Sequence, residues 1–203
     1  TRMQARPEAV SDRELVVSRR FSASPARLFT AWTEERHLKQ WFGPNGFTTQ
    51  TRAFEFREGG IWDFDMIGPD GTRFTNWIEW REIARPDRIR YIQGAGSDDP
   101  ESFETTVTFA VVDGATEITL HSLFKTKARR DEVVERFGAI EGGYQTLGRL
   151  SDYVEASASE GSAGRRLVTW NLQTLYGHFE GPTPWALDFH MNVWGEELEA
   201  FSL

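Results

Sequence analysis

Two carboxylates, Asp63 and Asp65, are the first residues whose spacing could support chemistry. Side chains two positions apart on a β-strand point to the same face, so the pair could serve as a general acid and a general base. Trp62, Phe64 and Met66 alternate with them, which predicts that the aspartates lie on the opposite, solvent-facing side of the sheet. We therefore expect a solvated surface and no catalytic role for this pair.

The histidines form no pattern that is typical of catalysis or metal binding. His121 is expected on a strand, without a partner carboxylate or a second ligand, which indicates a structural role. His37 belongs to a predicted short helix, where it either caps or covers the helix surface or lines the entrance of a cavity. His178 and His190 lie in the tail, and no HxH or HExxH spacing occurs. We predict no metal and no catalytic residue.

Glycines and charges argue against nucleotides and nucleic acids as ligands. The pairs Gly59-Gly60 and Gly142-Gly143 lack the G-x-G-x-x-G fingerprint and the lysine of a phosphate-binding loop, so we expect no cofactor. The formal net charge is -8 and the isoelectric point is about 5.1, whereas nucleic-acid binding rests on clustered lysine and arginine. The sequence therefore predicts no nucleic-acid partner.

Large aromatic residues are the remaining candidates for a binding site. Aromatic residues make up 13% of the chain and include eight tryptophans, and they form either a filled core or the wall of an apolar pocket. Asn76 and Tyr144 could orient a ligand by hydrogen bonds from such a wall. The candidate ligand-binding residues are Trp32, Trp41, Phe54, Phe56, Trp62, Phe64, Met66, Asn76, Trp80, Tyr91 and Tyr144.

The element that must organise these residues is a long helix predicted over residues 131–154. Apolar residues spaced by threes and fours form one stripe along it: Val133, Phe137, Ile140, Tyr144, Leu147, Leu150 and Val154. The helix also contains Gly138, Gly142, Gly143 and Gly148, although an interior glycine costs about 1 kcal/mol relative to alanine. Either the helix bends or packs closely at these positions, or the missing side chains leave room for a ligand.

The residues before this helix predict an antiparallel sheet. After a first strand at 14–21, Ser24 and Pro25 begin a helix, and a second short helix follows at 34–41. Six further stretches alternate with a period of two between turn signals: 47–56, 60–66, 73–83, 88–93, 102–112 and 116–124. Asp113-Gly114 predicts a two-residue hairpin. The fold class is therefore α+β, with about seven strands, two short helices and one long C-terminal helix.

Several phrases in this order resemble a known superfamily. They are R-F-x-A-S-P-x-x-L-F-x-A-W-T from Arg20, H-L-x-x-W-F-G-P-x-G-F from His37, R-E-G-G-x-W from Arg57 and G-x-x-x-T-L-x-R-L from Gly142. Residues 12–157 resemble the SRPBCC or START-like helix-grip superfamily, and within it the bacterial proteins related to the activator of the heat-shock-protein ATPase. The resemblance implies a curved antiparallel sheet that grips the long helix, with an apolar cavity between them.

The chain changes character after this domain. Residues 158–164 continue a run of small residues that begins at Ala156, and we expect a flexible linker there. Residues 165–203 begin with a strand-like run, Leu167–Leu172, and resemble the start of a dihydrofolate-reductase-like domain of the riboflavin-biosynthesis type. Tyr176 stands where that family has an aspartate, and the segment is too short for a nucleotide-binding sheet. We predict an incomplete appendage that binds no dinucleotide.

The tail carries apolar side chains that favour association. These are Leu167, Val168, Trp170, Leu172, Trp185, Leu187, Phe189 and Trp194. Such a set is expected to pack on the first domain or on a second copy of the chain, so a homodimer is a candidate assembly.

Three functions stay open at the level of sequence. The favoured one is non-catalytic binding of a small apolar molecule in the helix-sheet cavity. The alternatives are a protein-binding module that contacts a chaperone through an acidic surface, by analogy with the family, and an enzyme acting on a hydrophobic molecule. The absence of cysteine fits a reducing cytoplasm, and no apolar run is long enough for a membrane span.

Overall fold

The computed structural model describes residues 11–176, with side chains described as far as residue 158. Seven strands form one antiparallel sheet, as the sequence predicts, and their order is β1-β7-β6-β5-β4-β3-β2. The strands are β1 (Glu14–Phe21), β2 (Thr48–Phe54), β3 (Ile61–Ile67), β4 (Arg73–Ala84), β5 (Arg88–Gly94), β6 (Phe103–Val112) and β7 (Ala115–Leu123). The helices are α1 (Pro25–Thr33), α2 (Glu35–Trp41), α3 (Lys127–Phe137) and α4 (Ala139–Tyr176). This arrangement is an α+β helix-grip fold.

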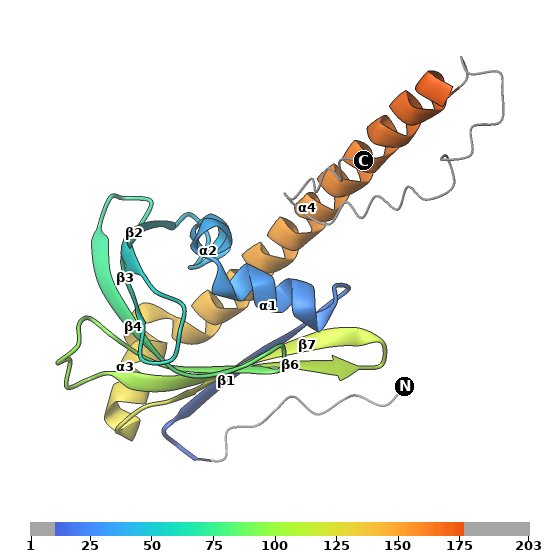
Figure 1. Ribbon diagram of the computed structural model, residues 1–203. Coiled ribbons are helices and arrows are strands. Elements are labelled where there is room, and N and C mark those ends of the chain that lie inside the picture. Colours follow the sequence, from blue (N-terminus) through green and yellow to red (C-terminus); the bar gives the residue numbers. More distant parts are fainter. Residues whose placement is uncertain (1–10, 177–203) are drawn as a thin grey trace. The chain divides into compact units, whose positions relative to one another are not determined.

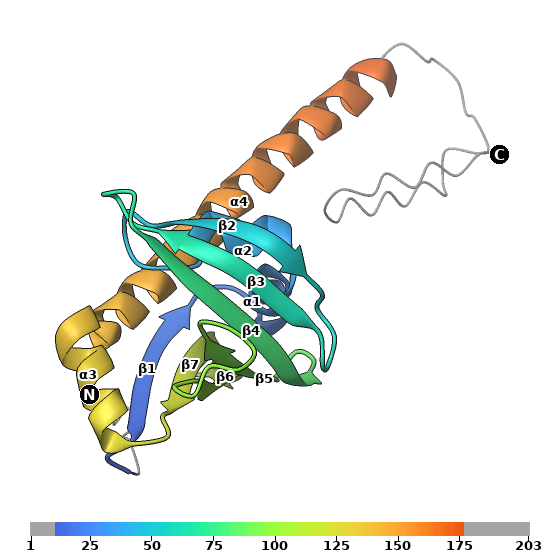
Figure 2. The ribbon, with the colours of Figure 1, turned by 90° about the vertical axis from the view of Figure 1, so that its left-hand side faces the viewer.

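The sheet is curved, and α1, α2 and the first turns of α4 lie on its concave side (Figure 1). Figure 2 shows the same curvature from the side of β3 and β4, with α1 and α2 behind the strands. Trp62 and Phe64 are fully buried on the concave face, and Asp63 and Asp65 point to the other side. The alternation therefore predicted correctly which face of β3 is apolar.

Local sequence explains how the turns and the first helix form. Ser24 caps α1 because its side chain accepts a hydrogen bond from the Arg27 amide at 3.3 Å, and Pro25 occupies the first turn. At the β6–β7 hairpin, Asp113 and Gly114 both have positive φ, at 51° and 79°. A turn of this kind matches the twist of the flanking strands. Both predictions from the sequence are confirmed.

The prediction of one helix over residues 131–154 is wrong, because two helices occupy this stretch. Gly138 ends α3 in the left-handed region at φ 62°, and α4 begins at Ala139. The helical spacing of apolar residues continues across the break, so periodicity alone could not reveal it. Phe137 and Ile140 flank the break and are 55% and 40% exposed, whereas Leu147, Leu150 and Val154 are buried. The predicted apolar stripe is therefore buried only in its second half.

The structure also differs from the sequence prediction after residue 155. Helix α4 continues through residues 158–164, where a flexible linker was expected, and through Leu167–Leu172, where a strand was expected. Extending an existing helix is far easier than starting one, so α4 can continue through the glycines and serines of this segment. Residues 177–203, which include Trp185 and Trp194, lie outside the described residues. The resemblance of the tail and the homodimer stay predictions.

The chain divides into two compact units, residues 1–154 and 155–203. Within the part that the structure describes, no helix is long and apolar enough to cross a membrane. The site described below lies entirely in the first unit.

Candidate functional site

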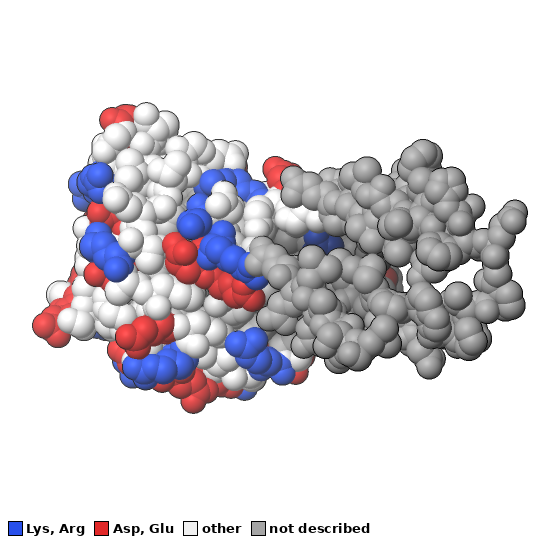
Figure 3. Space-filling model, turned by 45° about the horizontal axis from the view of Figure 1, so that its top comes forward, with Lys and Arg blue, Asp and Glu red and all other residues white. Residues whose placement is uncertain are grey.

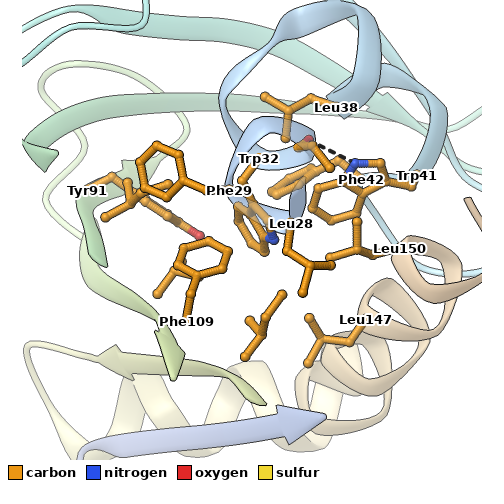
Figure 4. Packing of buried hydrophobic residues seen from close by; sticks show 14 of the residues in the cluster. Leu28, Phe29, Trp32, Leu38, Trp41, Phe42, Tyr91, Phe109, Leu147 and Leu150 are labelled. Atoms are coloured by element: carbon orange, nitrogen blue, oxygen red, sulfur yellow. Dashed lines mark hydrogen bonds between the residues drawn. The ribbon is translucent and has the colours of Figure 1, made fainter. Parts of the chain in front are cut away.

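The concave face of the sheet and the helices enclose an aromatic cluster (Figure 4). Six of the predicted ligand-binding residues are buried in it: Trp32, Trp41, Trp62, Phe64, Trp80 and Tyr91. Phe54, Phe56, Met66 and Tyr144 are half-buried and pack against it. Asn76 is buried at the same face of β4. The fold thus brings the predicted side chains from α1, α2, four strands and α4 to one interior.

The aromatic rings contact one another directly, mostly edge to face. The Trp32 and Trp41 ring centroids are 4.9 Å apart, and those of Phe42 and Trp62 are also 4.9 Å apart. Trp62 stacks on Phe64 at 3.8 Å. Edge-to-face pairs exploit the opposite charge of ring edge and ring face, so they add to the stabilisation from burial. The helices α1 and α2 are joined to the sheet through these rings.

Several residues of this interior were not among the sequence candidates. The same cluster also buries six other apolar residues: Leu28 and Phe29 of α1, Phe42, Phe109, Leu147 and Leu150. Phe42 follows α2 immediately and precedes the Gly43-Pro44 turn, so no periodic pattern contains it. Phe109 is buried on the apolar face of β6 and is not among the candidate ligand-binding residues. Its position opposite α1 depends on the sheet curvature, which the sequence does not specify.

A row of polar side chains crosses the concave face. The row follows directly paired positions across four neighbouring strands. These positions are Trp80 on β4, Tyr91 on β5, Thr105 on β6 and Ser122 on β7. Thr105 Oγ1 and Ser122 Oγ are 2.9 Å apart. Burial raises the pKa of the Tyr91 hydroxyl, while its hydrogen bond with Thr105 acts in the opposite direction. The hydroxyl therefore stays protonated at neutral pH.

Asn76 and Tyr144, the two polar candidates from the sequence, lie on different elements and make different contacts. Asn76 uses its side-chain amide within the sheet, because Nδ2 donates to the Phe74 carbonyl at 2.9 Å and Oδ1 accepts from Gln93 Nε2 at 3.0 Å. Tyr144 lies on α4 and packs against the apolar cluster. Asn76 is thus held in place by Gln93 and the backbone, which fixes the direction of its side chain.

His37 joins α2 to α4. Its Nδ1 lies 2.5 Å from the Tyr153 hydroxyl, and its Nε2 lies 3.5 Å from Glu34 Oε2. A neutral ring with the proton on Nε2 can accept from Tyr153 and face the carboxylate. Burial lowers the pKa of His37; the charge of Glu34 raises it and that of Arg36 lowers it. His37 is therefore neutral at pH 7 and acts as a link between two helices.

Arg149 connects two of the sequence motifs in the folded protein. Its guanidinium donates to the Gly43 and Pro44 carbonyls at 3.0 and 2.9 Å and to the Gln40 carbonyl at 3.2 Å. The T-L-x-R-L phrase on α4 thus binds the G-P turn that follows α2. Burial lowers the pKa of Arg149, yet an arginine remains charged at any physiological pH.

Outside the interior, charged groups form surface ion pairs. Arg52 contacts both Asp63 and Asp65, and its hydrogen bond with Asp65 lowers the pKa of that carboxyl. Both carboxylates thus lie on the face of β3 opposite Trp62 and Phe64, where they form ion pairs with Arg52. His121 does have a partner, Glu14 Oε2 at 3.2 Å, so the prediction of an isolated histidine is wrong because β1 pairs with β7. Figure 3 shows one face on which acidic and basic side chains stand side by side.

Gly143 is the one of the glycines Gly142, Gly143 and Gly148 in α4 that approaches a neighbouring side chain closely. A Cβ at Gly143 would lie 3.1 Å from Val17 Cγ2, tighter than most real contacts, while one at Gly142 would lie 3.5 Å from Pro44 Cγ. The chain therefore breaks at Gly138 and packs closely at Gly143, whereas the contact at Gly142 is an ordinary one. Among the described residues, no three histidine, aspartate or glutamate side chains gather where they could hold a metal ion.

Comparison with known proteins identifies relatives of this arrangement. The family model described as "Activator of Hsp90 ATPase homolog 1-like protein" matches residues 22–155. A solution structure of a protein from Arthrobacter aurescens is similar with a TM-score of 0.67 and 23% identity, over 73% of this chain and 90% of that chain. No curated protein sequence matches the chain.

Two crystal structures are similar in the same way. A protein from Chromobacterium violaceum has a TM-score of 0.62 and 22% identity, over 71% of this chain and 99% of that chain. The AHSA1 protein from Silicibacter pomeroyi has a TM-score of 0.58 and 21% identity, over 71% and 99% of the two chains. At these identities the structural similarity shows the fold alone.

Proposed function

Because the chain belongs to the family of Activator of Hsp90 ATPase homolog 1-like proteins, we propose that it binds a small apolar molecule between the concave face of its sheet and the helices α1, α2 and α4. The observation that carries this proposal is the aromatic cluster. Its rings come from elements far apart in the sequence and meet on the one face of the sheet that the helices cover. Aromatic walls of this kind are typical of sites for apolar ligands.

Polar groups inside the cluster support the same proposal. A purely structural core has no need of a row of hydroxyl groups, yet Tyr91, Thr105 and Ser122 cross the concave face beside the aromatic rings. Ligand sites combine an apolar lining with a few fixed polar groups that orient the ligand.

A titration with the neutral fluorescent probe N-phenyl-1-naphthylamine tests the proposal. We expect saturable quenching of the tryptophans with energy transfer to the probe. Ile118→Phe adds volume to a residue that is 0% exposed on the concave side and should weaken binding, whereas Val111→Phe, at a position that is 68% exposed, should not. Linear, unsaturable quenching in the wild type would exclude a site of this kind.

A second candidate is binding to an Hsp90-type ATPase, which the family description names. The observation that favours it is the pair of exposed apolar side chains at the break between α3 and α4, Phe137 and Ile140. The ATPase rate of a purified Hsp90 with and without the protein tests this candidate. A double substitution of both residues by serine should remove any stimulation, and an unchanged rate with the wild type would exclude it.

A further inference from the structure

Four tryptophans are buried in the cluster with at most 1% of their surface exposed: Trp32, Trp41, Trp62 and Trp80. Two of them have acceptors for the indole N–H. Trp41 Nε1 donates to the Ala31 carbonyl at 3.1 Å, and Trp62 Nε1 donates to Thr51 Oγ1 at 3.1 Å. The buried Nε1 atoms of Trp32 and Trp80 find no acceptor among the described residues. Buried donors in native proteins are almost always paired, so these two call for an acceptor from elsewhere.

The two unpaired donors belong to opposite walls of one interior. Trp80 lies on the concave face of β4, beside Tyr91 with ring centroids 5.6 Å apart. Trp32 lies on α1, and its ring centroid is 6.4 Å from that of Phe109. In Figure 4 the indole nitrogen of Trp32 and the hydroxyl of Tyr91 both point toward the centre of the cluster. An acceptor for the indole N–H of Trp32 must therefore come from within this space.

Rings connect the two donors without a break. Phe56 lies 5.0 Å from Trp80, Phe29 lies 6.5 Å from Phe56, and Phe29 lies 5.4 Å from Phe109, all between centroids. Phe109 in turn contacts Trp32. A molecule that reaches both indoles would therefore touch apolar surface along its whole length, with hydrogen-bond donors at two points.

The charge of the interior restricts the ligand further. The buried polar residues within the described side chains are Thr33, Asn76, Thr105, Thr116, Thr146 and Ser151, and none of them is charged. The cation nearest to the connecting rings is the exposed Arg85, whose guanidinium carbon lies 5.2 Å from the Phe29 ring centroid and 5.7 Å from that of Phe56. A carboxylate placed among the buried residues would lose its hydration and find no buried cation, which is strongly unfavourable. An uncharged oxygen, such as that of a ketone, ester or ether, requires no such compensation.

On this basis, and resting on the proposed function, we infer that the ligand is a neutral apolar molecule with a carbonyl-type oxygen that accepts a hydrogen bond from the indole N–H of Trp32 or Trp80. These two tryptophans would then set the chemical class of the ligand. Trp41 and Trp62 would contribute only apolar surface, because their donors are already used.

Acetophenone and cumene provide a matched pair of probes, since the second replaces the ketone oxygen by a methyl group of similar size. Calorimetric titration of the full-length protein gives the affinity for each probe. Trp80→Phe and Trp32→Phe remove a donor but keep an aromatic ring. We expect at least one of these substitutions to reduce the affinity for acetophenone about three- to tenfold more than the affinity for cumene. This factor corresponds to the loss of one neutral hydrogen bond. The control Trp62→Phe should change both affinities by the same factor.

A second measurement on the wild type does not depend on the folding of a variant. With ¹⁵N-labelled tryptophan, the Nε1–H resonances of Trp32 and Trp80 should move downfield with acetophenone and much less with cumene, while those of Trp41 and Trp62 stay close to their positions. Benzoate should bind more weakly than acetophenone at pH 7.

The outcomes separate the two proposals. If both probes bind but neither tryptophan variant changes the ratio of their affinities and neither resonance moves selectively, the inference about the ligand class is refuted while apolar binding stands. Tighter binding of benzoate would refute the neutral character of the ligand. If no probe binds at all, the proposed function fails together with the inference.

Discussion

At the scale of single residues, polar side chains in this protein mostly join elements that lie far apart in the sequence. His37 links α2 to Tyr153 of α4, and Arg27 of α1 donates to the Val154 carbonyl at 2.7 Å. Arg149 reaches back more than a hundred residues to the turn after α2. These contacts hold the helices over the concave face, so they position the aromatic cluster without belonging to it.

The stability of the protein should depend on the protonation of His37. Burial keeps its pKa in the folded state below the ordinary value of 6.5, so the unfolded chain binds the proton more tightly. The stabilising contribution is complete above about pH 6.5 and is lost as the pH falls through the lower pKa of the folded state. Urea unfolding between pH 7.5 and 5 should show this loss in the wild type and less of it in His37→Gln. An identical pH slope in both proteins would contradict this assignment.

Replacing Arg149 should destabilise the fold through lost hydrogen bonds. Arg149→Met leaves the Gly43, Pro44 and Gln40 carbonyls without their donor, and hydrogen bonds to a charged group contribute about 1.5–3 kcal/mol. Arg149→Lys should recover only part of this, because an ammonium group lacks the planar fork. Arg57, whose side chain is 67% exposed, offers the control: Arg57→Met should change the free energy of unfolding by less than about 0.5 kcal/mol. Equal effects at the two positions would argue against the role of Arg149.

At the scale of elements, the break between α3 and α4 decides which residues enter the interior. If one straight helix covered residues 131–154, Phe137 and Leu147 would lie on the same uninterrupted apolar stripe. The left-handed Gly138 redirects the chain, so α3 lies against β1 while α4 carries Leu147 and Leu150 into the core. Because of this break, Phe137 and Ile140 lie outside the core and are exposed.

Substitutions at two neighbouring glycines should have opposite effects. Gly138→Ala forces a side chain into the left-handed region and should lower the free energy of unfolding by about 1–2 kcal/mol, with Gly138→Asn less harmful. Gly142→Ala lies inside α4, where the new Cβ meets only Pro44 at 3.5 Å, and should raise stability by up to about 1 kcal/mol. Urea unfolding of the three variants measures both effects. A stabilised Gly138→Ala would show that the break is absent.

At the scale of the whole molecule, the compact unit of residues 1–154 contains the sheet, the buried half of the apolar stripe and the candidate site. Everything that the proposed function requires lies in this unit. The remaining residues, 155–203, extend α4 to Tyr176 and then pass outside the described part of the chain.

Removal of residues 159–203 should therefore leave a folded domain. We expect the shortened chain to unfold in one cooperative transition and to bind acetophenone and cumene with affinities close to those of the full chain. Sedimentation of both proteins tests the predicted association through the tail, because a dimer that forms through it would be lost on truncation. Loss of cooperative unfolding would show that the tail is part of the core.

The sequence by itself determined the parts of this protein that depend on local physics. Alternation of apolar and polar residues located six of the seven strands, the Ser24-Pro25 and Asp113-Gly114 signals located a helix start and a hairpin, and the order of the motifs indicated the family. These features depend on neighbours within a few residues, so a linear pattern contains them.

Only the tertiary structure decided what depends on distant partners. Helical spacing continues across Gly138, so the break shows only in the backbone, and small residues at 158–164 are compatible with either a linker or a helix. The four buried tryptophans look alike in the sequence. Whether an indole N–H finds an acceptor depends on which strand or helix the fold places against it, and those of Trp32 and Trp80 find none among the described residues.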